Sequence, residues 1–95
     1  MSDVVLFKAL NGEEVIARLV EETDEVLTIE KARVFASHDD PNQPGTLVVG
    51  MLPWYVSAAD ETIDVYKTHI FSRISLIPSE LERGYIAQTS AIDLV

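Results

Sequence analysis

Residues Leu10 to Ala32 read LNGEEVIARLVEETDEVLTIEKA. The pair Asn11-Gly12 predicts a hairpin turn, because both residue types tolerate the positive φ angles that tight turns require. Along Glu14 to Glu21, Val15, Ala17 and Leu19 fall on one face with a period of two and the residues between them on the other, which predicts a strand with one buried face and one half-covered face. The polar segment Glu22 to Glu25 separates this strand from the next apolar segment. The stretch therefore predicts a meander of short antiparallel strands.

The strand expected at Val26 to Phe35 has an imperfect alternation. Leu27 and Ile29 share a face with Lys31, whereas Ala32 falls on the opposite face. A β-bulge or a sharp bend near Lys31 would reconcile the two halves of the pattern. Strong bending is also what a small closed barrel needs to turn its corners.

Further strands and a helix follow this stretch. Polar loops precede Thr46 to Val56, which contains a continuous apolar run, and Ile63 to Ile77, which is one long strand or a pair of strands. With the apolar segment before the hairpin turn, these give five expected strands. Ser79 and Glu82 form a capping box, which predicts a short helix over about residues 79–90.

The length of 95 residues predicts a single domain over residues 1–95. No apolar run reaches the roughly 20 residues that a membrane-spanning helix needs, and the first residues lack the basic segment of a secretory signal. The sequence has no cysteine, which excludes disulfides and thiolate metal sites. We therefore expect a cytoplasmic protein without a membrane partner.

The formal net charge is −9, from 16 acidic and 7 basic residues. Nucleic acids bind through lysine and arginine side chains that neutralise phosphates, and an acidic protein repels phosphates at long range. Any nucleic-acid site on this chain must therefore be local. The acidity is otherwise explained by solubility.

The opening stretch resembles the first motif of Sm and Sm-like proteins. The residues that carry the resemblance are Leu10-x-Gly12-x-x-Val15-x-Ala17-x-Leu19. Asp24 falls at the Asp position of that motif, and Thr28 falls where the family usually has Asn. The chain departs from the motif at Ala17, where Gly is usual, and in a Gly-to-Asp spacing that is one residue longer than is common.

A second resemblance lies in VYKTHIFSRISLIPS, residues 65–79. The bacterial Sm-like RNA chaperone carries Tyr-Lys-His at the turn between its last two strands, followed by an apolar strand that ends in Pro. Here the corresponding residues are Tyr66-Lys67, His69 and Pro78, with Thr68 inserted. The turn lies either at this position or at residues 57–62, which would place the basic residues within the last strand.

The resemblance implies an all-β fold, a small, strongly bent five-stranded antiparallel Sm-like barrel with strands over about residues 4–77 and a short C-terminal helix. In the family the helix usually precedes the first strand. Pro53-Trp54 and the IPSEL segment, residues 77–81, resemble small Sm-like proteins of tailed bacteriophages. Sm-like subunits form closed rings by pairing the fourth strand of one subunit with the fifth strand of the next.

Elementary physics also favours ring formation, because the apolar run Leu47 to Leu52 is a liability if it forms an unpaired edge strand. Ring closure removes every such edge. The alternative is that this run forms an internal, central strand of a monomer. In Sm-like rings, RNA bases stack and hydrogen-bond near the pore. By position, the resemblance implies an RNA site formed by Asp24, Thr28, Lys67 and His69.

Two functions follow. The first is a homo-oligomeric ring that binds single-stranded RNA as a non-enzymatic module of RNA metabolism or an RNA chaperone. The alternative is an acidic structural or protein-interaction ring that keeps the fold without binding RNA, favoured by the net charge and by Thr28.

No catalytic function is expected, because the sequence holds no nucleophile elbow, phosphate-binding loop or dinucleotide motif. His38-Asp39-Asp40 offers metal-ligand types, but three consecutive loop residues rarely converge on one ion, so neither a metal nor a cofactor is expected. Trp54-Tyr55 is either an interface anchor or a contact that caps the core.

Overall fold

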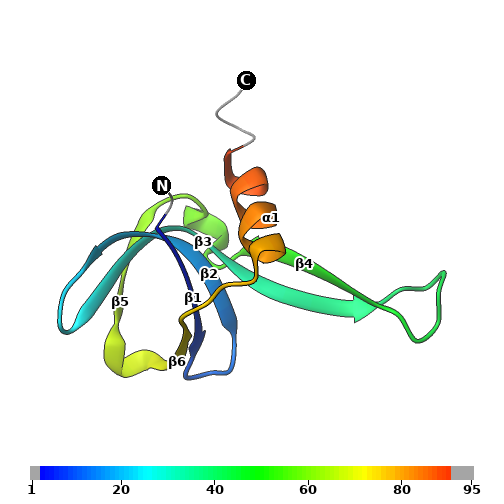
Figure 1. Ribbon diagram of the computed structural model, residues 1–95, viewed down its shortest axis with the longest axis horizontal. Helices are drawn as coiled ribbons and strands as arrows, with labels where there is room; N and C mark the ends of the chain where they lie inside the picture. The colour runs from blue at the N-terminus through cyan, green and yellow to red at the C-terminus, as the bar shows by residue number, and fades with distance from the viewer. Residues whose placement is uncertain (1–2, 91–95) are drawn as a thin grey trace.

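The computed structural model describes residues 3–90, which form one antiparallel sheet and a C-terminal helix (Figure 1). In chain order the strands are β1 (Val4–Ala9), β2 (Glu14–Glu22), β3 (Val26–Asp39), β4 (Leu47–Pro53), β5 (Thr62–Tyr66) and β6 (Ile70–Ile74). The remaining elements are two 3-10 turns, η1 (Val56–Ala58) and η2 (Lys67–His69), and the helix α1 (Ser79–Ser90).

The sheet has the strand order β4-β3-β2-β1-β6, and β5 pairs with β3 off this path. The expected closed barrel of five strands is therefore corrected to an open sheet of six strands. The segment expected at residues 46–56 ends its strand at Pro53, and the N–H of the next residue, Trp54, still donates to the carbonyl oxygen of Ala32 at 3.0 Å. The segment expected at residues 63–77 is a strand pair that the turn η2 divides. The alternative that placed Lys67 and His69 within a strand is wrong.

Strand β3 bends where the sequence pattern predicted it. Lys31 has a φ of 54°, which is in the left-handed region, and the β2–β3 register shifts between Ile16 and Arg18. Before the bend β3 pairs with β5, and after it β3 pairs with β4. The strand continues beyond the predicted end at Phe35, so that β3 and β4 project from the sheet as a long hairpin (Figure 1).

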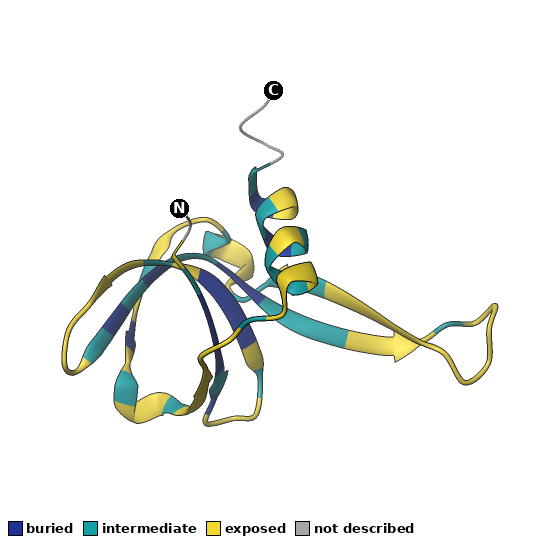
Figure 2. Cartoon of the chain, in the orientation of Figure 1, coloured by how far each residue is buried: buried dark blue, intermediate teal, exposed yellow. Residues whose placement is uncertain are grey.

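Apolar side chains are buried on both faces of β1 and β2, and Figure 2 shows buried residues along β1, β2 and β3. One cluster consists of Val5, Phe7, Val15, Ala17, Leu27, Ile29, Ala32 and Val65. On the other face, α1 covers Leu6 and Ile16 with Tyr85, which is 1% exposed. The helix has the predicted bounds and gives the second face its core. Within residues 3–90, no helix is long and apolar enough to cross a membrane.

Candidate functional site

The turn between β2 and β3 lies next to the turn η2. The backbone N–H of Lys67 donates a hydrogen bond of 2.8 Å to the carbonyl oxygen of Glu25. Thr23 holds the β2–β3 turn, because its hydroxyl oxygen accepts the N–H of Val26 at 3.0 Å. Asp24 lies exposed in this turn. The structure therefore brings together two of the four sequence-predicted site residues, Asp24 and Lys67.

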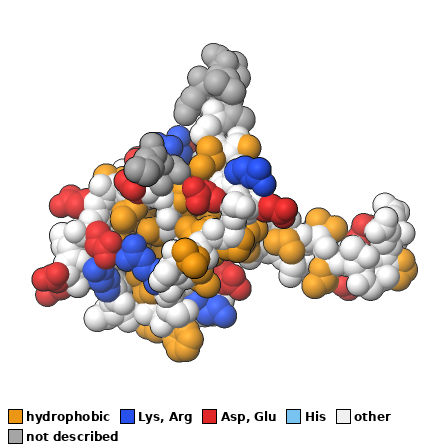
Figure 3. Space-filling model, viewed as in Figure 1, with side chains coloured by type: hydrophobic (Ala, Val, Ile, Leu, Met, Phe, Trp, Pro, Cys, Tyr) orange, Lys and Arg blue, Asp and Glu red, His pale blue; other side chains and the backbone are white. Residues whose placement is uncertain are grey.

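The two basic groups at this site share one acidic partner. Glu22 Oε2 lies 2.8 Å from Lys67 Nζ and 3.0 Å from Arg73 Nη1. The hydrogen bond from Lys67, and then that from Arg73, holds the pKa of Glu22 below its usual value. A phosphate at this position would have to compete with the Glu22 carboxylate for both cations. Figure 3 shows no continuous basic surface on the face in view.

Thr28 and His69 have other neighbours. The Thr28 hydroxyl donates a hydrogen bond of 2.8 Å to Asp64 Oδ1, across the pairing of β3 with β5. His69 contacts the ring of Tyr66 edge to face at a centroid distance of 6.0 Å, and its carbonyl oxygen accepts the N–H of Leu10 at 3.0 Å. His69 therefore adjoins the β1–β2 turn as well as Tyr66.

Sequence reasoning missed Glu22, Arg73 and Asp64 as partners of the predicted residues. Glu22 and Arg73 belong to strands far apart in the sequence, and Asp64 meets Thr28 through strand pairing. The only signal that would have found them was the strand register, which the sequence pattern left open around Ile63 to Ile77.

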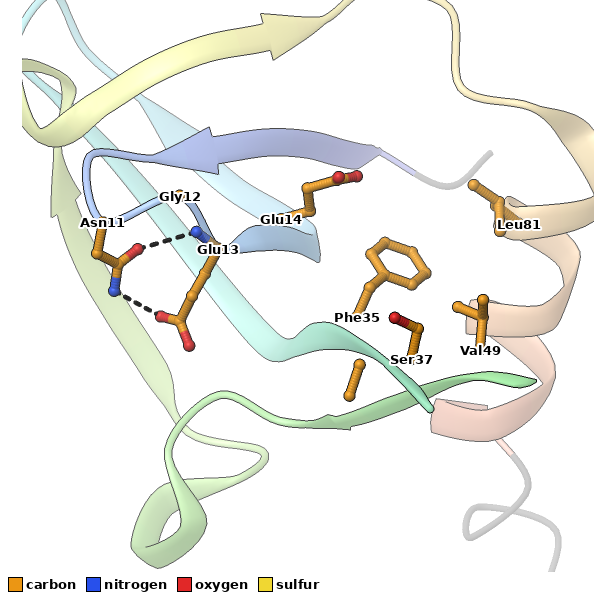
Figure 4. A pocket seen from close by; sticks show the side chains of 9 residues that line it. Asn11, Gly12, Glu13, Glu14, Phe35, Ser37, Val49 and Leu81 are labelled. Atoms are coloured by element: carbon orange, nitrogen blue, oxygen red, sulfur yellow. Dashed lines mark hydrogen bonds between the residues drawn. The ribbon is translucent and has the colours of Figure 1, made fainter. Parts of the chain in front are cut away.

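A pocket of about 570 Å³ lies between the β1–β2 turn, the β3–β4 hairpin and α1 (Figure 4). Phe35, Val49 and Leu81 supply its apolar lining. At its polar end, Asn11 Nδ2 donates to Glu13 Oε1 at 2.8 Å. No nucleophile adjoins a base among its lining residues, and no cluster of three metal-ligating side chains occurs within residues 3–90.

The two residues of the Trp54-Tyr55 pair have different environments. Trp54 packs against the core, with its ring 6.0 Å from that of Phe7, and its Nε1–H donates to Glu13 Oε1 at 3.1 Å. Tyr55 is 48% exposed. The core-contact interpretation therefore holds for Trp54, and the Tyr55 side chain is accessible on the surface.

Exposed apolar side chains lie on the outermost strands of the sheet path. The exposed fractions are 63% for Leu47, 60% for Val49 and 55% for Leu52 on β4, and 72% for Phe71 and 47% for Ile74 on β6. Leu76, just after β6, is 89% exposed. Strand β6 pairs only with β1, and β4 pairs only with β3 within the described residues. Both ends of the path therefore offer unpaired backbone beside apolar side chains.

No protein-family model matches this chain, and no curated protein matches it. Its function is therefore inferred from its own residues and geometry.

Proposed function

We propose that the chain is the subunit of a closed, Sm-like homo-oligomeric ring that acts as a non-enzymatic scaffold. The observation that carries this proposal is the pair of apolar, unpaired strand edges at opposite ends of the sheet path, on β4 and β6. The two Sm-like motifs in the sequence support the same assembly. In the ring, each subunit would contribute β6 to one neighbour and the edge formed by β4 and β5 to the other.

The energetic reason is the cost of leaving such edges open. An unpaired strand exposes backbone N–H and C=O groups that template pairing with another chain, and adjacent apolar side chains strengthen that tendency. Pairing β6 of one copy with the opposite edge of the next is a heterologous contact, which gives a finite assembly only when the ring closes. A closed ring would bury Phe71 and would complete the sheet that is open in one chain.

The charges near η2 favour a scaffold that binds other proteins over one that binds phosphates. Both nearby cations, Lys67 and Arg73, are held by Glu22. With a net charge of −9 on each chain, a ring accumulates negative charge and repels polyanions at long range.

Substitution at the β6 edge tests the assembly. Phe71→Glu places a charge in the proposed interface and is expected to give monomers in light scattering, with an unchanged circular dichroism spectrum. Val56→Glu is the matched control, because Val56 is 90% exposed and lies in η1. A Phe71→Glu variant that retains the mass of the parent would refute pairing through β6.

A second candidate function is the binding of single-stranded RNA at Asp24, Thr28, Lys67 and His69. The contact between the β2–β3 turn and η2 favours it, because three of these residues, Asp24, Lys67 and His69, come from those turns. The test is a titration with a uridine-rich oligonucleotide at low salt. Binding that weakens with salt and with Lys67→Ala would support this site, and the absence of binding at low salt would exclude it.

A further inference from the structure

The pocket of about 570 Å³ beside α1 combines apolar and acidic side chains. In Figure 4 the ring of Phe35 lies between Glu14 and the α1 residue Leu81. The carboxylates of Glu13 and Glu14 belong to the lining, which contains no lysine or arginine. Such a site favours an occupant that is both apolar and cationic.

The apolar face of the β3–β4 hairpin continues beyond the part that α1 covers. Phe35 and Met51 are register partners, and both pack against the core cluster under α1. Because side chains on a strand alternate between its two faces, Val49 and Leu47 lie on the same face as Met51. Both are more than half exposed. The face extends about 13 Å from Met51 to Leu47, and no element within residues 3–90 covers its outer part.

Acidic side chains lie at both ends of this exposed face. Glu14 shares a face of β2 with Ile16, which belongs to the cluster under α1. Asp39 is the register partner of Leu47 at the far end of the hairpin. Lys8 is opposite Glu14 in the β1–β2 register, but no ion pair joins the two. Within the described residues, neither Glu14 nor Asp39 has an ion-pair partner.

A basic amphipathic helix from another protein matches both the shape and the charge of this face. A helix of about nine residues spans 13 Å, and apolar residues at helical spacing along one side of it would cover the exposed valine and leucine. A second copy of this chain has no such segment to offer. Its seven lysine and arginine residues all lie within strands, η2 or α1, where the fold already uses them.

We propose that this face docks a basic amphipathic helix of a partner protein, whose apolar side chains pack on Val49 and Leu47. The basic residues of that helix pair with Glu14 at one end and Asp39 at the other. This inference rests on the proposed scaffold role, whose protein partner it specifies, but it does not require the ring, because one chain builds the whole face. Subunit pairing would use the backbone edge of β4, whereas docking uses side chains on the face of the sheet.

The test is fluorescence anisotropy of a synthetic peptide in which leucines at helical spacing form one side and lysines the other. The intact protein is expected to bind it saturably and not to bind the same peptide with glutamate in place of lysine. Val49→Ser should weaken binding about tenfold, because it removes apolar surface that the helix buries. Val48→Ser is the matched control, because Val48 is exposed on the same strand and lies on the opposite face.

The acidic end is tested in the same assay. Glu14→Gln should weaken binding several-fold, because a basic residue of the peptide loses its partner. Glu21→Gln changes the net charge equally on the same strand and should leave the affinity unchanged. Circular dichroism establishes that each variant is folded.

Absence of saturable binding would overturn the proposal. Equal losses with Val49→Ser and Val48→Ser, or with Glu14→Gln and Glu21→Gln, would overturn it as well, because they would attribute binding to overall charge. Light scattering on the same samples reports assembly separately. A mass that falls with Val49→Ser but not with Val48→Ser would identify a second copy as the occupant and contradict the proposal. A monomer that binds the peptide would refute the ring and support this docking face.

Discussion

The hydroxyl of Tyr85 donates a hydrogen bond of 2.8 Å to the carbonyl oxygen of Lys31. Lys31 is the residue at which β3 bends, with a φ of 54°, and Tyr85 is the buried residue of α1 that covers the second face of the sheet. The helix is thus attached to the point where β3 changes its partner from β5 to β4. Both the shape of the sheet and the position of the projecting hairpin depend on this bend.

Removing the hydroxyl with Tyr85→Phe should lower the free energy of unfolding by about 1 kcal/mol, the usual net value of one hydrogen bond. Truncation with Tyr85→Ala should lower it by about 4 kcal/mol, because it also removes a buried ring. Urea unfolding followed by circular dichroism measures both. Equal stability of Tyr85→Phe and the parent would show that the contact with Lys31 contributes nothing.

The pH dependence of stability should carry the signature of Tyr85. Burial raises the pKa of Tyr85 from its usual 10.0 to about 12. The unfolded state therefore releases this proton first as pH rises, and the stabilising contribution falls between about pH 10 and pH 12. The parent should lose more stability than Tyr85→Phe over this interval in matched urea titrations. Parallel pH profiles for the two proteins would contradict the assignment.

Substitutions at Lys31 should separate backbone strain from side-chain contacts. Lys31→Gly and Lys31→Val remove the same ammonium group, but only glycine adopts a φ near 54° without steric cost. We expect the valine variant to be less stable than the glycine variant by about 1–2 kcal/mol in urea unfolding. The reverse order would mean that the left-handed conformation is not maintained in solution.

Glu22→Gln should release Lys67 and Arg73 from their shared carboxylate. The variant is therefore expected to bind single-stranded oligonucleotides more tightly than the parent at low salt, with a steeper decrease of affinity as salt rises. Glu21→Gln is the control, because it changes the net charge equally and Glu21 is exposed on the same strand. The same gain with both variants would attribute the effect to overall charge.

The local features of the fold were predictable from the sequence, because they depend on neighbouring residues. Asn11-Gly12 forms the β1–β2 turn, with Gly12 at a φ of 93°. The bend at Lys31 and the helix at residues 79–90 were also identified correctly. Each of these features is encoded by turn chemistry, alternation or capping within a few residues.

The long-range features were not predictable in the same way. That the sheet remains open in one chain depends on which edges meet in space, and no local pattern reports this. Glu22 ends β2 and Lys67 begins η2, so the two residues are far apart in the sequence and no local pattern predicts their ion pair. The sequence therefore suggested that Lys67 was free to bind phosphate. The extension of β3 to Asp39 was missed because its polar residues resemble a loop, although they pair with β4 in the projecting hairpin.

The most direct test of the proposed ring is the mass of the intact protein by light scattering, measured over a wide range of concentrations. Closed head-to-tail pairing predicts one species whose mass is a fixed integer multiple of the 10.5 kDa chain and does not change on dilution. A monomer of 10.5 kDa at every concentration would contradict the account. A continuous ladder of sizes would equally contradict it, because edge strands that pair without closing form open filaments.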